Sequence, residues 1–203
     1  MKKINFSRLV ILGCCIALVT LASVTHTIGQ SIKGSTSNPV ISIEPVLSIS
    51  NWMPITRGGS MLARKANGIY MTLNATELTP GTAVTAWVGV FNNPQFCSTT
   101  PCTPADAGNP LVQASRINAG GVVVGNDGSV NFGGFRAVGD TRGAEGPGLL
   151  NPLTAQVDLV IRSHGPAFSF QFHPALLTQQ LTMFNGGCPP NPCQDFGVST
   201  HLP

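Results

Sequence analysis

"GIYMTLNATELTPGTAVTAWVGVFNN", residues 68–93, contains two segments in which apolar side chains occupy every second position. This two-residue period is typical of β-strands that bury one face. Between the segments, "LTPG" places Pro80 and Gly81 at positions that favour a tight turn. The alternating apolar residues are Ile69, Met71 and Leu73 in the first segment and Val84, Ala86, Val88 and Val90 in the second. The stretch therefore predicts a strand, a turn and a second strand.

Strand-like segments of similar length lie on both sides of this unit. They cover residues 40–50, 111–117, 121–125, 129–137 and 155–163. The "GNDG" between two of them contains residues that accept the positive φ of tight turns, so a hairpin is expected over residues 121–135. Short strands at this spacing predict an all-β fold. We expect a single Greek-key-like β-sandwich of about seven or more strands over residues 40–203.

One segment is compatible with a helix, "PALLTQQLTMF" from Pro174 to Phe184. Proline is favoured in the first turn of a helix, and the "NGG" that follows the segment is a helix stop signal. The same residues also alternate as a strand does, so both interpretations stay open at this point. The fold is therefore expected to contain at most one short helix.

The first 29 residues have the pattern of a secretory signal peptide. A basic start precedes an uncharged apolar run, Leu9–Ala22, and the segment ends in small residues. The run is shorter than the about 20 residues that span a bilayer. We expect cleavage between residues 22 and 30, followed by a flexible polar segment at residues 30–39.

A rival interpretation is a lipoprotein signal in which Cys14 or Cys15 is acylated. Few apolar residues precede Cys14, so a cleavable signal peptide is favoured. No later stretch is long and apolar enough to span a membrane, so no stable membrane span is expected after cleavage. The sequence thus predicts a secreted or periplasmic bacterial protein.

Charge excludes one class of partner. Three of the 11 lysines and arginines lie in the predicted signal peptide, which leaves 8 of them beside 8 aspartates and glutamates. A nucleic-acid-binding protein needs a basic surface, and the only remaining basic cluster is Arg64–Lys65. We therefore expect no nucleic-acid partner.

Four cysteines remain after the signal peptide, in "CSTTPC" (residues 97–102) and "CPPNPC" (residues 188–193). An even number of cysteines at matched spacing favours disulfides in an oxidising compartment. Local pairing, Cys97 with Cys102 and Cys188 with Cys193, is the preferred arrangement because a proline in each loop favours a turn. Pairing between the two loops and a four-thiolate zinc site are the alternatives.

The histidines are the remaining candidates for chemistry: His164, His173 and His201. Three imidazoles can hold a catalytic metal and leave one position open, although these are not spaced as neighbours on one strand or helix. The chain has no G-x-S-x-G, H-E-x-x-H or phosphate-binding glycine motif, and its acidic residues are scattered. No catalytic residue and no cofactor are therefore predicted.

Four segments carry a resemblance to known sequences: "NATELTPGTAVTAWVGVFNNPQFC", "ASRINAGGVVVGNDGSVNF", "VDLVIRSHGPA" and "MFNGGCPPNPC". Through them, residues 65–203 resemble a family of uncharacterised secreted bacterial proteins. The "LTPGTAVTAWV" unit and the strand with "DLVIRSHGPA" are also distantly similar to CHRD domains, the β-rich extracellular modules named after chordin. CHRD repeats usually carry an H-x-H strand, where this chain has only His164. The resemblance implies a sandwich-like fold and extracellular binding, and it transfers no catalytic residue.

The function expected from the sequence is a non-enzymatic binding or structural module. Its partner would be an extracytoplasmic ligand or protein whose identity the sequence does not indicate. The alternative is a metal-binding protein or metal-dependent enzyme that uses His164, His173 and His201.

Overall fold

The alternating stretch at residues 68–93 forms two strands of the structure, a computed structural model that describes residues 38–203. They are β3 (Gly68–Ala75) and β4 (Thr82–Phe91). In β3 the apolar positions are buried and Tyr70 on the other face is exposed, as the period predicts. The predicted signal peptide and nearly all of the predicted flexible segment lie outside the described residues.

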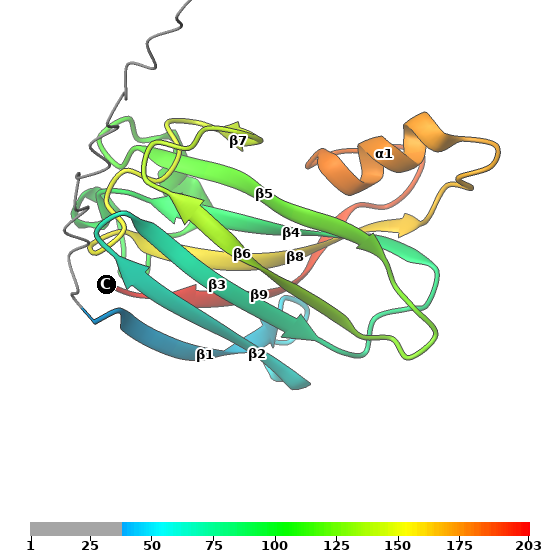
Figure 1. Ribbon diagram of the computed structural model, residues 1–203, viewed down its shortest axis with the longest axis horizontal. Coiled ribbons are helices and arrows are strands. Elements are labelled where there is room, and N and C mark those ends of the chain that lie inside the picture. The colour runs from blue at the N-terminus through cyan, green and yellow to red at the C-terminus, as the bar shows by residue number, and fades with distance from the viewer. Residues whose placement is uncertain (1–37) are drawn as a thin grey trace, which may run out of the picture. The chain divides into compact units, whose positions relative to one another are not determined.

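Nine strands form one hydrogen-bonded sheet in which all neighbours are antiparallel (Figure 1). Its order is β6-β3-β2-β1-β9-β8-β4-β5-β7. The other strands are β1 (Val40–Ser48), β2 (Pro54–Lys65), β5 (Ala114–Val123), β6 (Val130–Ala137), β7 (Ala144–Glu145), β8 (Gln156–Pro166) and β9 (Gln194–His201). The helical elements are η1 (Pro94–Phe96), η2 (Pro104–Gly108) and α1 (Pro174–Thr182).

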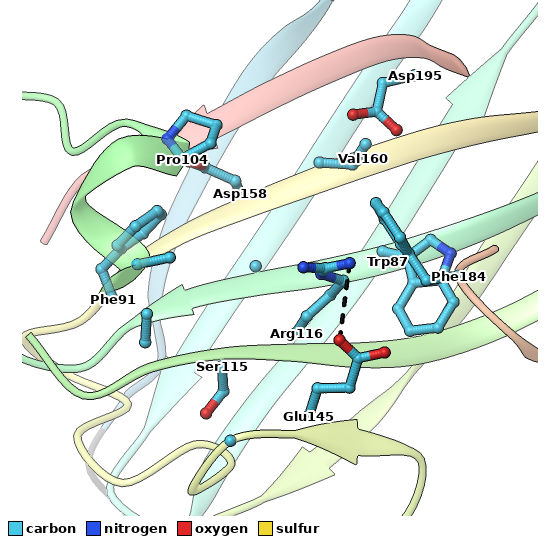
Figure 2. A pocket seen from close by; sticks show the side chains of 14 residues that line it. Trp87, Phe91, Pro104, Ser115, Arg116, Glu145, Asp158, Val160, Phe184 and Asp195 are labelled. Carbon is cyan, nitrogen blue, oxygen red and sulfur yellow. Dashed lines mark ion pairs between the residues drawn. The ribbon is translucent and has the colours of Figure 1, made fainter. Parts of the chain in front are cut away.

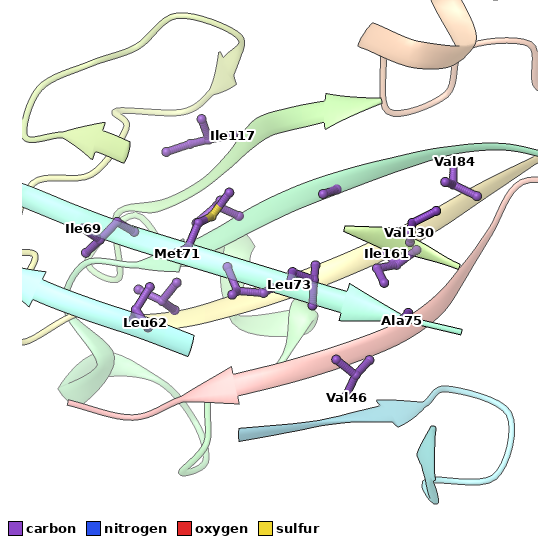
Figure 3. Close-up of a cluster of buried hydrophobic side chains, with 14 of the residues drawn as sticks. Val46, Leu62, Ile69, Met71, Leu73, Ala75, Val84, Ile117, Val130 and Ile161 are labelled. Carbon is purple, nitrogen blue, oxygen red and sulfur yellow. The ribbon is translucent and has the colours of Figure 1, made fainter. Parts of the chain in front are cut away.

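The sheet is curled, so that the half made of β6, β3, β2 and β1 lies across the half made of β9, β8, β4 and β5 (Figure 1). Apolar side chains from both halves meet in the space between them (Figure 3). Each such side chain contributes about 1.5–3 kcal/mol when it is fully buried. The all-β prediction with at most one short helix is confirmed. The two separate sheets of a sandwich are not confirmed, because all nine strands belong to one continuous hydrogen-bonded sheet.

The predicted hairpin at residues 121–135 is wrong. β5 pairs with β4 and β7, whereas β6 pairs with β3, so the turn carries the chain from one half of the sheet to the other. It lies beside the β3–β4 turn: Leu78 N–H donates to Gly128 O (3.1 Å) and Gly81 N–H to Val124 O (2.9 Å). Gly128 has φ +66°, and a Cβ there would be 2.8 Å from Leu78 O. Glycine is required because the two turns cross so closely.

The segment that could have been a strand or a helix is helical, and it forms α1. The helix is largely exposed, but its Gln180 is fully buried. The Gln180 amide donates to the carbonyl oxygens of His164 (3.3 Å) and Pro166 (3.0 Å), which holds the helix against the end of β8. Within residues 38–203, no helix is long and apolar enough to cross a membrane.

The sequence did not predict β2 and β9, because polar residues occupy inward positions on both strands. Ser60 and Arg64 on β2 are buried, and so is His201 on β9. The Arg64 guanidinium donates to the carbonyl oxygens of Pro152 and Ala155 (both 2.8 Å) and of His201 (2.9 Å). These bonds replace the water that the buried cation has lost.

Candidate functional site

Five neighbouring strands each contribute one residue to a row across the outer face of the sheet. In strand order the row is Thr200, Asp158, Gly89, Arg116 and Glu145. Because Gly89 has no side chain, the row is open between Asp158 and Arg116. A cleft of about 360 Å³ lies over this gap (Figure 2).

Phe184 forms one end of the cleft. Its ring lies between the guanidinium groups of Arg116 (3.7 Å from the ring centroid) and Arg162 (3.9 Å). The ring also meets Trp87 edge-on, with centroids 5.3 Å apart, and covers this side chain on the outer face of β4 (Figure 2). Stacking on an aromatic face fixes the plane of each guanidinium. Arg162 already donates to Phe184 O and to Asp195 Oδ1 (both 2.7 Å), whereas Arg116 has only a loose contact with Glu145 at 3.7 Å.

Phe91 of β4 and Pro104 of η2 line the other end of the cleft (Figure 2). The loop closed by Cys97 and Cys102 directly precedes η2. Gln156 on β8 holds this loop with two hydrogen bonds. Cys102 N–H donates to Gln156 Oε1 (2.7 Å), and Gln156 Nε2 donates to Cys102 O (3.1 Å). Both ends of the cleft are therefore built in part by irregular segments that the sheet positions.

The charges in the cleft have different surroundings. Burial raises the pKa of Asp158 to about 6, although hydrogen bonds from Gln156 and Thr200 favour its ionised form. Arg116 and Glu145 form a loose, solvent-exposed pair at 3.7 Å. Above pH 6 the cleft thus presents a desolvated carboxylate on β8 and a stacked guanidinium on β5.

The structure does not bring the three predicted metal-ligand histidines together. His164 lies near one end of β8, whereas His201 pairs with Val157, seven residues earlier on that strand. Seven residues of strand span about 23 Å. His173 is exposed at the start of α1. A metal site made of these three residues is therefore not formed.

The structure joins Cys97 to Cys102 and Cys188 to Cys193, which is the local pairing expected from the sequence. The paired Cα atoms are 5.4 and 5.9 Å apart, within the usual range for disulfides. The first loop precedes η2, whose Pro104 lines the cleft. The second lies against His164, which is fully buried.

His164 belongs to a chain of hydrogen bonds that starts at Trp87. Trp87 Nε1 donates to Thr85 Oγ1 (2.7 Å), and Thr85 Oγ1 lies 2.8 Å from His164 Nε2. At the other side of the ring, His164 Nδ1 is 3.0 Å from Gly186 O. An indole N–H only donates and a carbonyl only accepts, so the proton of the neutral imidazole is on Nδ1. Burial lowers the pKa of His164, which favours this neutral form.

Sequence reasoning missed the cleft residues Asp158, Arg116, Glu145 and Phe184. One signal was present in "AQVDLVIRS", where Asp158 and Arg162 occupy the outer face of an otherwise apolar strand. Two charges on that face indicate a polar surface, but not what lies opposite. Glu145 and Phe184 reach the cleft from a two-residue strand and a loop, and neither has a periodic pattern.

Comparisons of the chain with models of protein families, with curated proteins and with solved structures found no match. The resemblances to a secreted bacterial family and to CHRD domains therefore stay predictions.

Proposed function

We propose that this protein is an extracytoplasmic binding module that holds a small zwitterionic ligand in the cleft and releases it unchanged. The observation that carries the proposal is the open gap at Gly89, where the desolvated carboxylate of Asp158 faces the guanidinium of Arg116. The extracytoplasmic location is supported by the two disulfides, which persist mainly in oxidising compartments, and by the predicted signal peptide.

The chemistry of the two ends of the gap suggests the ligand class. Arg116, held flat by Phe184, can bind a carboxylate through two parallel hydrogen bonds, and Asp158 can pair with an ammonium group. The two strands that carry them are about 10 Å apart, since one strand lies between them. A volume of about 360 Å³ is at the small end of ligand pockets. An amino acid or short peptide fits these limits, with an apolar side chain against Phe91 or Phe184.

The alternative of a metal-dependent enzyme built on His164, His173 and His201 has no support from their positions, because the structure does not bring these three side chains together. The binding proposal also explains why a carboxylate lies in a site that disfavours its charge. Groups with strongly shifted pKa values in a cleft are candidates for function. Ligand binding at Asp158 would recover the free energy that burial of the carboxylate costs.

The test is isothermal titration of the full chain with a panel of free amino acids and dipeptides, with neutral monosaccharides as comparison ligands. We expect saturable binding of at least one zwitterion. Asp158→Asn and Arg116→Gln should each weaken it about 10- to 100-fold, as expected for loss of one charged hydrogen-bonding partner. Gly89→Val should abolish binding, because its side chain would fill the gap. The variant should still fold, since a Cβ at this position makes only ordinary contacts with Asp158.

Matched controls are Asp127→Asn and Arg57→Gln, which remove the same charges outside the cleft and should leave affinity unchanged. Affinity should fall as the pH drops through about 6, where Asp158 becomes protonated, and the Asp158→Asn variant should lack this dependence. Recovery of chemically unchanged ligand after incubation supports a non-enzymatic role. Equal binding by wild type and Gly89→Val, or zwitterion binding that is insensitive to Asp158 and Arg116, would refute the proposed site.

A further inference from the structure

A second group of side chains, separate from the cleft, brings three metal-ligating atoms together. His164 Nδ1 is 3.9 Å from Cys188 Sγ and 3.7 Å from Cys193 Sγ. All three atoms lie within 4.8 Å of one another. Within residues 38–203, no comparable group surrounds the Cys97–Cys102 disulfide. The two cysteine loops, which look alike in sequence, are therefore chemically different.

The distances are close to those of a metal centre. In a tetrahedral zinc site, Zn–S bonds of about 2.3 Å and Zn–N bonds of about 2.0 Å place nitrogen and sulfur about 3.5 Å apart. The His164 nitrogen already lies within a few tenths of an ångström of that separation from both sulfurs. Only the two sulfur atoms must move apart, to about 3.8 Å. Both cysteines are partly exposed, so a reductant and an ion can reach them.

The surroundings of His164 suit a ligand. A metal-binding imidazole usually has its second nitrogen held by a hydrogen bond, and here Thr85 Oγ1 is 2.8 Å from Nε2. The Thr85 hydroxyl can donate to Nε2 or accept from it, because it has one hydrogen and two lone pairs. It accepts the Trp87 indole N–H in either case. Thr85 can therefore support the tautomer with the proton on Nε2, which leaves the Nδ1 lone pair free for a metal.

We propose that reduction of the Cys188–Cys193 disulfide creates a zinc site made of both thiolates and His164 Nδ1. A dithiol reductant supplies two electrons and two protons; the S–S bond breaks, two thiols form, and the reductant becomes a disulfide. Zn²⁺ then displaces both thiol protons to solvent, while the imidazole proton moves from Nδ1 to Nε2. Water takes the fourth position, as at zinc sites with three protein ligands. The oxidised protein has no such site, since the sulfurs are bonded to each other and Nδ1 carries a proton.

The test uses the full chain with Cys14 and Cys15 replaced by serine, so that only the four described cysteines remain. The protein is titrated anaerobically with Co²⁺, before and after treatment with a dithiol that is then removed. After reduction we expect one Co²⁺ per chain with the thiolate charge-transfer absorption of a tetrahedral site, and its displacement by one Zn²⁺. The untreated protein should show neither signal. Circular dichroism checks that every sample is folded.

Paired variants locate the site. Cys97→Ser with Cys102→Ser should keep the signal, whereas Cys188→Ser with Cys193→Ser should abolish it. His164→Gln should weaken Zn²⁺ binding at least tenfold, and His201→Gln, a change at the other buried histidine, should leave it unchanged.

If His164→Gln does not fold, X-ray absorption of the reduced wild-type zinc protein decides the matter. Two sulfurs at about 2.3 Å and one nitrogen at about 2.0 Å are expected. No metal uptake by the reduced protein, uptake that persists without Cys188 and Cys193, or a zinc shell without nitrogen would each overturn the proposal.

Discussion

Replacing Asp158 by asparagine should stabilise the fold at neutral pH and leave its stability unchanged near pH 4. The pKa of Asp158 is about 6 in the folded protein because burial disfavours the carboxylate, against about 3.9 for an aspartate in an unfolded chain. Below pH 4 the group is protonated in both states. As pH rises from about 4 to 6 the unfolded state ionises first, so the folded state loses stability, and above pH 6 the loss is complete.

Ionisation of Asp158 lowers the free energy of unfolding by about 3 kcal/mol, because its pKa is about two units higher in the folded than in the unfolded protein. Asparagine has nearly the same size, can accept the hydrogen bond from Gln156, and has no charge to desolvate. The Asp158→Asn variant should therefore be more stable than wild type by up to about 3 kcal/mol at pH 8, and equal to it at pH 4. The wild-type curve alone does not show this, because buried His201 has the opposite pH dependence. The difference between the two proteins cancels the contribution of His201.

The assay is urea unfolding at pH 4, 5, 6, 7 and 8 with both disulfides intact, followed by tryptophan fluorescence. Asp127→Asn is the control, because hydrogen bonds from Ser129 lower the pKa of Asp127. That variant should show no stabilisation at pH 8. If Asp158→Asn is no more stable relative to wild type at pH 8 than at pH 4, the carboxylate is not desolvated and the argument for the cleft loses its electrostatic basis.

Three further changes test other parts of the structure by denaturant unfolding. Burial and a nearby arginine lower the pKa of His201 to about 4, so the folded state loses up to about 3 kcal/mol as pH falls from about 6.5 to 4. His201→Gln should remove that loss. If the stability of the variant falls between pH 6.5 and 4 as steeply as that of wild type, the prediction is wrong. Leu73→Ala should destabilise the fold by about 2–5 kcal/mol and Tyr70→Ala, on the outer face of the same strand, by much less; equal effects would mean that the strand register is wrong. Gly128→Ala should lower the free energy of unfolding clearly more than Gly139→Ala, since both glycines have positive φ but only the Cβ at 128 would meet a neighbouring backbone. Similar denaturation midpoints for the two variants would show that the two turns do not lie so close together.

Several local features of this protein follow from its sequence alone. The two-residue period in residues 68–75 and 82–91 predicts both strands. In β3 it also predicts the buried face, because a shift of one residue would turn its apolar side chains to solvent. A glycine at the 125–128 turn and a proline at the start of α1 are equally local signals. Short loops also favour the two local cysteine pairs.

The partners of each strand depend on contacts far apart in the chain. The alternating pattern in β5 and β6 predicts strands but not the neighbours of either strand. The turn between them therefore looked like a hairpin in the sequence, whereas in the structure it connects the two halves of the sheet. β2 and β9 have polar inward residues whose burial is favourable only with partners elsewhere. Arg64, for instance, needs carbonyl oxygens that lie 88 or more residues away in the sequence.

The two candidate sites depend on the tertiary structure in the same way. The cleft exists because the sheet places Gly89 between Asp158 and Arg116, and a glycine in a strand does not reveal what flanks it on neighbouring strands. The histidines illustrate the reverse case: the sequence suggested a shared site, but β8 and β9 hold His164 and His201 at opposite ends of their ladder. The sequence by itself thus determined the strand periods and favoured the local cysteine pairs, since neighbouring residues decide these, whereas it left residues 174–184 open between a helix and a strand. Only the tertiary structure decided which side chains meet, because antiparallel pairing brings together residues that no local pattern connects.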